Sequence, residues 1–243
     1  MEHLPAYIPF LFGATTLLTV GLFFKASRSS KLSLAVITGW MLLQAGIGLS
    51  GFYTYTTGLP PRLLLLVLPP LLTILLLFVT PAGRRFVDRL NFKILTLLHV
   101  VRIPVEIVLF WLFLHKAIPQ LMTFEGRNLD ILAGLTAPLV YYFAFVQKTL
   151  GRKGQLLWNF ACIGLLMNIV GTAALAAPTP FQKLAFEQPN VGVLYFPFVW
   201  LPGVIVPLVL LSHLASIRQL LRKKPAPAGN CIERVLPSSI PAH

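Results

Sequence analysis

Residues 94–115 read ILTLLHVVRIPVEIVLFWLFLH, an apolar run that carries His99, Arg102 and Glu106. About 20 apolar residues in a helix cross the hydrocarbon core of a bilayer, which is about 30 Å thick. Ionisable side chains at that depth are costly, so they must face protein or water rather than lipid. The run therefore predicts a transmembrane helix whose polar side is turned toward other helices.

Apolar runs of similar length recur along the chain, separated by Gly, Pro or charged residues. They cover residues 6–24, 32–53, 62–80, 129–147, 155–177 and 193–215. The chain is 56% hydrophobic and 11% charged, with a mean hydropathy of +0.80, which is not the composition of a soluble protein. We predict an all-α, polytopic integral membrane protein with seven transmembrane helices within residues 1–224, followed by a disordered tail at 225–243.

The net charge of +13 is explained by the positions of the basic residues. Most of them follow the first, third, fifth and seventh runs: Lys25, Arg28, Lys31, Arg84, Arg85, Arg89, Lys93, Lys148, Arg152, Lys153, Arg218, Arg222, Lys223, Lys224 and Arg234. The segments after the second, fourth and sixth runs hold few basic residues. Together with the N-terminus, these segments hold most of the acidic residues, including Glu2. Because basic loops stay in the cytoplasm, we predict a multi-pass protein of the cell membrane, with its N-terminus outside and its C-terminus inside. We expect these basic residues to interact with anionic lipid, not with nucleic acid.

A weak internal repeat relates the first three runs to the last three. The matched features are Gln44 with Asn168, Gly48 with Gly171, and Leu68-Pro69 with Leu201-Pro202. They predict two parallel triplets joined by an inverting fourth helix, a 3+1+3 arrangement of a kind known among transporters. The alternative is chance, because Gly and Pro are frequent in membrane helices.

Two families with seven helices in this layout lack their defining residues here. Retinal proteins need a Schiff-base lysine in helix 7, and residues 193–215 contain none. The layout is similar to that of the SWEET sugar transporters, but the Pro-Gln kinks of that family do not occur in the predicted spans. The similarity is one of layout alone, so neither family is assigned.

The ionisable residues of the fourth helix share one face. At 100° per residue, His99, Arg102 and Glu106 fall within about 60° of one another, and Arg102 and Glu106 have the i,i+4 spacing of an intrahelical ion pair. Pro104 leaves the carbonyl of Val100 without its helical partner, which predicts a kink. In the functional interpretation Glu106 carries a proton, Arg102 lowers the pKa of Glu106 or anchors a substrate, and His99 relays protons toward the cytoplasm.

The alternative is a neutral pair that tethers the fourth helix to its neighbours. Gln44 and Asn168 lie in the outer halves of two other helices, and an amide in hydrocarbon needs a partner or a cavity. We place both on the predicted substrate or proton pathway. Trp200, beside Pro202, is the remaining candidate, because a broken seventh helix could present it to a cavity.

The motif Phe-Glu-x-x-Asn occurs twice on the outer side, at residues 124–128 and 186–190. Each copy precedes a descending helix, so its Asn is expected to cap a helix N-terminus and its Glu to interact with the helix dipole. The functional alternative is a polar vestibule above the charged face of the fourth helix. The predicted vestibule residues are Glu125, Arg127, Asp130 and Glu187.

The sequence assigns no cofactor and no metal. His99 and His213 could ligate a haem, or a metal together with Glu106, but they lack supporting spacing, and Cys162 and Cys231 form no motif. We predict a membrane transporter or channel for a small polar or charged solute, proton-coupled through the fourth helix. The alternatives are a membrane enzyme acting on a lipid or isoprenoid, and a ligand-binding or partner subunit of a membrane complex. The sequence is also compatible with a homo-oligomer.

Overall fold

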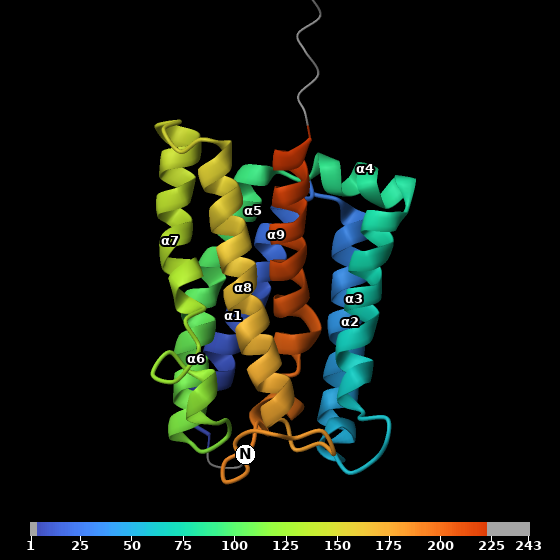
Figure 1. Ribbon diagram of the computed structural model, residues 1–243. Helices are drawn as coiled ribbons and strands as arrows, with labels where there is room; N and C mark the ends of the chain where they lie inside the picture. Colours follow the sequence, from blue (N-terminus) through green and yellow to red (C-terminus); the bar gives the residue numbers. More distant parts are fainter. Residues whose placement is uncertain (1–3, 223–243) are drawn as a thin grey trace, which may run out of the picture.

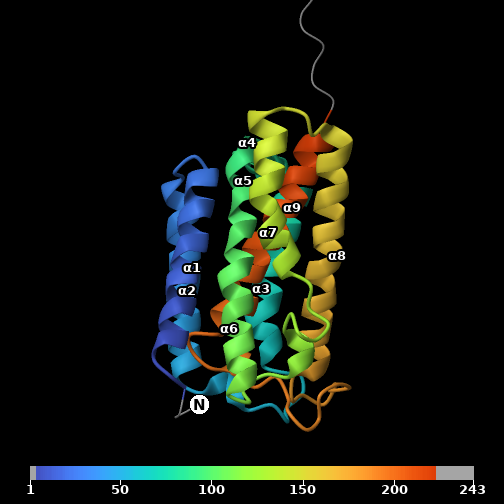
Figure 2. The same ribbon diagram turned by 90° about the vertical axis from the view of Figure 1, so that its left-hand side faces the viewer.

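A computed structural model describes residues 4–222 of the chain, and helices form most of it (Figures 1 and 2). No strand occurs in this range. The predictions for Glu2, Lys223, Lys224 and the tail at 225–243 concern residues that lie outside the described range. An all-helical fold is therefore confirmed for residues 4–222 alone.

The helical elements follow one another along the chain in a fixed order. They are α1 (Tyr7–Ala26), α2 (Lys31–Leu49), η1 (Phe52–Thr54), α3 (Leu63–Val79), α4 (Pro81–Arg89), α5 (Phe92–Leu98), η2 (His99–Val101), α6 (Arg102–Leu114), η3 (Gln120–Met122), α7 (Ile131–Tyr141), η4 (Tyr142–Val146), α8 (Arg152–Ala176), η5 (Gly192–Leu194), η6 (Leu201–Ile205) and α9 (Val206–Leu221). The elements η4 and η6 are π-helical turns, and the other η elements are 3₁₀ turns.

Five helical segments of the described chain are long and apolar enough to cross a membrane. They are α1, α2, the continuous segment Phe92–Leu114, α8 and the segment Leu201–Leu221. The pair α3 and α4 raises the number to six if it counts as one span, and Ile131–Val146 is a shorter apolar helix. Several spans of an integral membrane protein are thus supported, while the number seven stays a prediction.

The chain turns sharply between α3 and α4, whose axes meet at 94°. Thr80 is extended and its hydroxyl accepts a hydrogen bond from the Gly83 amide, which caps the new helix, and Pro81 starts it. Gly83 lies against the backbone of Leu77, where a Cβ atom would come within 2.5 Å of the Leu77 Cα. α4 consequently lies across the end of the bundle that also holds the α7–α8 connection, called the basic end below (Figure 1).

An ion-pair cluster ties α4 to α9 at the basic end. Arg218 Nε and Nη2 donate to the Asp88 carboxylate over 2.8 and 3.1 Å, and Arg222 Nη1 lies 2.7 Å from Asp88 Oδ2. The hydrogen bonds from Arg218, together with the two positive charges, lower the pKa of the Asp88 carboxyl below its ordinary value of 3.8. The lowered pKa means that this cluster stabilises the fold when Asp88 is ionised.

Replacing Asp88 by Asn is expected to lower the free energy of unfolding by about 1 kcal/mol at neutral pH. Because the pKa of Asp88 is lower in the folded than in the unfolded protein, its contribution is present above about pH 4 and disappears as the pH falls through the folded value. Unfolding curves at pH 7 and pH 3 test this. A matched control is Glu187→Gln, at an exposed acid; an equal loss at both pH values would contradict the prediction.

The centre of the bundle is formed by α1, α5, α6 and α9. α5 packs against α1 and α9, and α6 packs against α1. The helix of the opening stretch tightens into the 3₁₀ turn η2 just before Pro104, where a proline deprives the preceding turn of a helical hydrogen bond. α8 packs against α9 on one side, and α3 packs against η6 and α9 on another. This arrangement surrounds the space beside α6 in which the candidate site lies.

Candidate functional site

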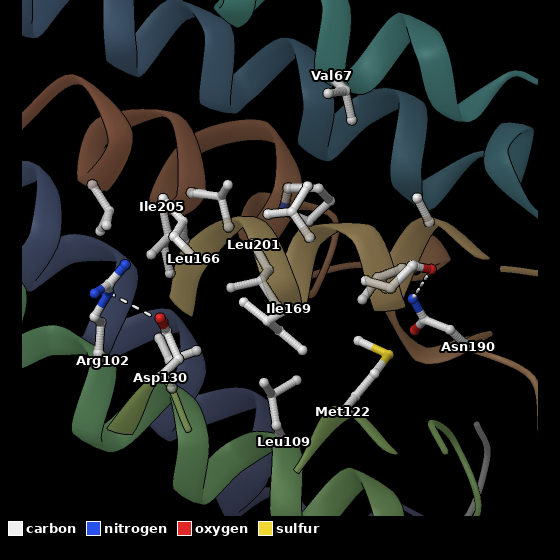
Figure 3. A pocket seen from close by; sticks show the side chains of 18 of the residues that line it. Val67, Arg102, Leu109, Met122, Asp130, Leu166, Ile169, Asn190, Leu201 and Ile205 are labelled. Carbon is white, nitrogen blue, oxygen red and sulfur yellow. Dashed lines mark hydrogen bonds and ion pairs between the residues drawn. The ribbon is translucent and has the colours of Figure 1, made fainter. Parts of the chain in front are cut away.

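A cavity of about 230 Å³ lies among α3, α6, α8 and the segment η6–α9. Most of its wall is formed by Leu, Val, Ile, Ala and Pro side chains. Its polar lining residues are Arg102, Glu106, Asp130 and Asn190. In Figure 3 the pair of Arg102 and Asp130 lies at one end, Asn190 lies at the other, and the labelled side chains between them are apolar. The cavity is therefore a hydrocarbon-walled space with charged groups at one end.

Arg102 pairs with Asp130, which precedes α7. Arg102 Nε lies 3.1 Å from Asp130 Oδ2, and both side chains are less than 10% exposed. This differs from the expected pair with Glu106 on the same helix. Gly134 explains the approach of α7, because a Cβ atom there would lie 2.8 Å from Ile103 Cγ1 and 3.1 Å from the Ile103 amide nitrogen. The missing side chain brings the start of α7, and with it Asp130, against Arg102.

The ion pair leaves polar atoms unsatisfied. Among the described residues, Arg102 Nε, Nη1 and Nη2 and Asp130 Oδ1 have no hydrogen-bond partner. Nε thus contacts Asp130 through charge, without the geometry of a hydrogen bond. Buried polar groups are normally hydrogen-bonded, so an orphaned set at a cavity wall indicates a place for another molecule.

Glu106 is held by Asn128, a residue that the sequence interpretation treated only as a helix cap. Asn128 Nδ2 lies 2.6 and 2.7 Å from the two Glu106 carboxyl oxygens and also donates to the Met122 carbonyl. Asn128 Oδ1 accepts from the Asp130 amide over 3.0 Å. Glu106 and Asn128 are buried. One amide side chain therefore holds the Glu106 carboxyl group and the Asp130 backbone; the repeated Phe-Glu-x-x-Asn motif was the signal that could have indicated it.

The site holds one guanidinium and two carboxyl groups. Arg102 can neutralise one carboxylate, and Asp130 occupies that place. A second ionised carboxylate in a buried position would be uncompensated, which is costly in a medium of low dielectric constant. Glu106 is therefore a group that can take up a proton or face a cation within the protein.

His99 and His213 form a stacked pair one turn from Arg102, on its basic-end side. Their rings lie 3.7 Å apart at 14°, and His213 Nδ1 lies 2.9 Å from Asn159 Oδ1. Trp158 contacts both rings edge-on. Such close stacking leaves no room for a macrocycle between the rings. No group of three His, Cys, Asp or Glu side chains suited to a metal occurs within residues 4–222.

The other predicted pathway residues do not line the cavity. Gln44 is buried and accepts a hydrogen bond from the Tyr53 hydroxyl, whereas Asn168 is exposed and donates to the Arg127 carbonyl over 2.8 Å. The two matched amides thus have different surroundings. Trp200 Nε1 donates to the Met41 carbonyl over 3.0 Å, which links the start of η6 to α2.

The predicted vestibule is divided between the surface and the interior. Glu125, Arg127 and Glu187 are exposed on the connections opposite the basic end, and Asp130 is buried against Arg102. Asn190, in the second outer motif, lines the cavity, where its Nδ2 donates to the Ala173 carbonyl. Asp130, Asn128 and Asn190, which the sequence predicted as loop residues, therefore belong to the site.

Residues 59–221 match the model of a protein family described as a domain of unknown function, DUF8737. The matched range runs from the connection before α3 to the end of α9, and it includes all the polar residues of the cavity. Neither the curated proteins nor the solved structures contain a match to the chain.

Proposed function

The chain belongs to the DUF8737 family, and we propose from its site that it is a membrane transporter for a small solute that carries a polar or charged group. The observation that carries the proposal is the cavity that reaches Arg102, Glu106 and Asp130 inside the bundle. A purely structural tether would satisfy its own donors, whereas both Nη atoms of Arg102 are free of partners among the described residues. Arg102 anchors the solute in this proposal.

Proton coupling belongs to the same proposal. Glu106 is the carrier, because a proton on its carboxyl group removes the uncompensated charge and loss of the proton restores it. His99 and His213 extend from the site toward the basic end and relay protons along that side. Intramembrane ionisable groups arranged in this way are typical of proton-coupled transporters.

The orientation and the repeat complete the proposal. The basic end faces the cytoplasm, with α4 on the inner surface of the membrane. The helix Ile131–Val146 serves as the fifth of seven spans. The segment Phe92–Leu114 then joins the triplet α1–α3 to the triplet α7–α9, and the cavity lies beside this linker, where transporters built from repeats hold their substrates.

The apolar wall of the cavity favours a second function. A membrane enzyme that acts on a lipid or isoprenoid, or a ligand-binding subunit of a membrane complex, would also need a hydrocarbon-lined site with few polar groups. Binding without solute-driven proton flux would identify that alternative.

Proteoliposomes loaded with a pH-sensitive dye test the transport proposal. We expect at least one class in a panel of carboxylates, amino acids, amines and sugars to acidify the lumen, and Glu106→Gln to reduce this flux by about tenfold or more. The matched control is Glu125→Gln, at an exposed acid of the outer loops, which should keep the flux. Folding of each variant is checked by size-exclusion chromatography. Flux that survives in Glu106→Gln would refute the role of Glu106.

A further inference from the structure

The cavity opens sideways through the wall of the bundle. Most of its lining side chains are buried, including those at both ends, but Leu64 on α3 and Ala174 on α8 are exposed. Both residues lie on apolar helices near the outer loops, and α3 packs against η6 and α9. The route into the cavity therefore runs between α3 and α8, from the surface that faces lipid.

The closed end of the cavity offers donors and an acceptor side by side. Arg102 Nη1 and Nη2 are free donors, and Asp130 Oδ1 is a free acceptor, within the described residues. A carboxylic acid matches this pair, because its carbonyl oxygen accepts from the guanidinium and its hydroxyl group donates to the carboxylate. An alcohol must make both contacts with a single oxygen atom, whereas a carboxylic acid has two oxygen atoms to span them, and an ammonium group has no acceptor for Arg102.

We propose that the cavity binds a single-chain carboxylic acid that enters from the bilayer. The carboxyl group lies between Arg102 and Asp130, and the hydrocarbon chain follows the wall formed by Leu109, Leu166 and Ile169 (Figure 3). At about 230 Å³ the cavity is smaller than the sites of about 300–1,000 Å³ that enclose a drug-sized ligand, so the distal part of a long chain extends between α3 and α8 into lipid.

This inference rests on the proposed function and names its solute class. An ionised ligand would add a third negative charge to a site with one guanidinium, so the acid binds together with a proton. The proton stays on the ligand carboxyl group, whose hydroxyl donates to Asp130, and no covalent bond forms or breaks. Movement of the acid would therefore carry a proton with it.

Photolabelling of the full chain in lipid nanodiscs tests the inference. The probe is dodecanoic acid with a diazirine close to its carboxyl group, and labelled residues are mapped by mass spectrometry. We expect labels on the cavity-facing residues of α6 and α8. Excess dodecanoic acid should reduce them by about tenfold, and equal amounts of dodecanol or dodecylamine should reduce them by less than about twofold.

Two matched variants test the route of entry. Ala174→Trp places a large side chain at the opening and should reduce the specific labels by about tenfold, because it blocks the space between α3 and α8. Ala161→Trp introduces the same residue at another exposed alanine of α8, which does not line the cavity, and should leave the labels within about twofold.

Labels that dodecanoic acid does not displace, or that dodecanol displaces equally well, would overturn the inference. Equal labelling of the two tryptophan variants would also overturn it. Specific labelling without solute-driven proton flux would leave a carboxylic-acid-binding protein and refute transport alone. Proton flux driven by another solute class, without specific labelling, would refute the ligand class and leave transport standing.

Discussion

Asp130→Leu is expected to lower the free energy of unfolding by about 3–5 kcal/mol, because it leaves Arg102 buried without its carboxylate. The Arg102 side chain is only 3% exposed, and Asp130 is its one ion-pair partner among the described residues. A buried guanidinium that loses its counter-charge keeps the full cost of desolvation. Reversible unfolding of the protein in mixed micelles, monitored by circular dichroism, measures the change.

A double-mutant cycle assigns the partner of Arg102. The variant Arg102→Leu/Asp130→Leu should regain much of the stability lost in Asp130→Leu, because replacing both members of a buried pair by apolar residues is far less costly than removing one. The comparison cycle uses Arg102→Leu with Glu106→Leu. A coupling energy between Arg102 and Glu106 as large as that between Arg102 and Asp130 would show that the pairing described above is wrong.

Asn128→Asp is expected to destabilise the protein strongly at pH 8 and much less at pH 5. The substitution keeps the shape of the side chain but places a carboxyl group where Nδ2 lies 2.6 and 2.7 Å from the Glu106 oxygens. Two carboxylates at that distance cannot both ionise, so they must share a proton. At pH 8 we expect a loss of about 2–4 kcal/mol in the free energy of unfolding.

Asn168→Asp is the matched control for that substitution. Its side chain is exposed and, among residues 4–222, hydrogen-bonds to the Arg127 carbonyl alone, so the same chemical change should cost less than about 1 kcal/mol at either pH. The measurement is the unfolding midpoint of both variants at pH 5 and pH 8. A pH-independent loss in Asn128→Asp would mean that Glu106 is not its neighbour.

Most helices could be placed from hydropathy alone. The runs at 6–24 and 155–177 became α1 and α8 with ends shifted by a few residues, and the run at 94–115 became one continuous segment with a tightened turn before Pro104. Such runs are visible in the sequence because a chain in lipid must satisfy its backbone hydrogen bonds within each helix, whatever its neighbours are. The run at 62–80 ended as expected, but the turn into α4 depends on Thr80 and Gly83.

The partners of the charged residues could not be found in this way. The i,i+4 spacing of Arg102 and Glu106 permits a pair, but Asn128 takes both oxygens of Glu106 and Asp130 reaches Arg102 from the next helix. Both partners lie more than 20 residues away in the chain. The absence of a side chain at Gly134 allows that approach, and no local pattern shows which helix packs against it.

The opening stretch therefore determined by itself that a helix with three ionisable groups lies in an apolar bundle, because hydropathy and helical period are properties of a segment. Only the tertiary structure decided the surroundings of each of those groups: Arg102 and Glu106 line a cavity, and His99 stacks on His213. The physical reason is that the cost of a buried charge depends on what lies within a few ångströms of it, and those neighbours come from α7, α8 and α9.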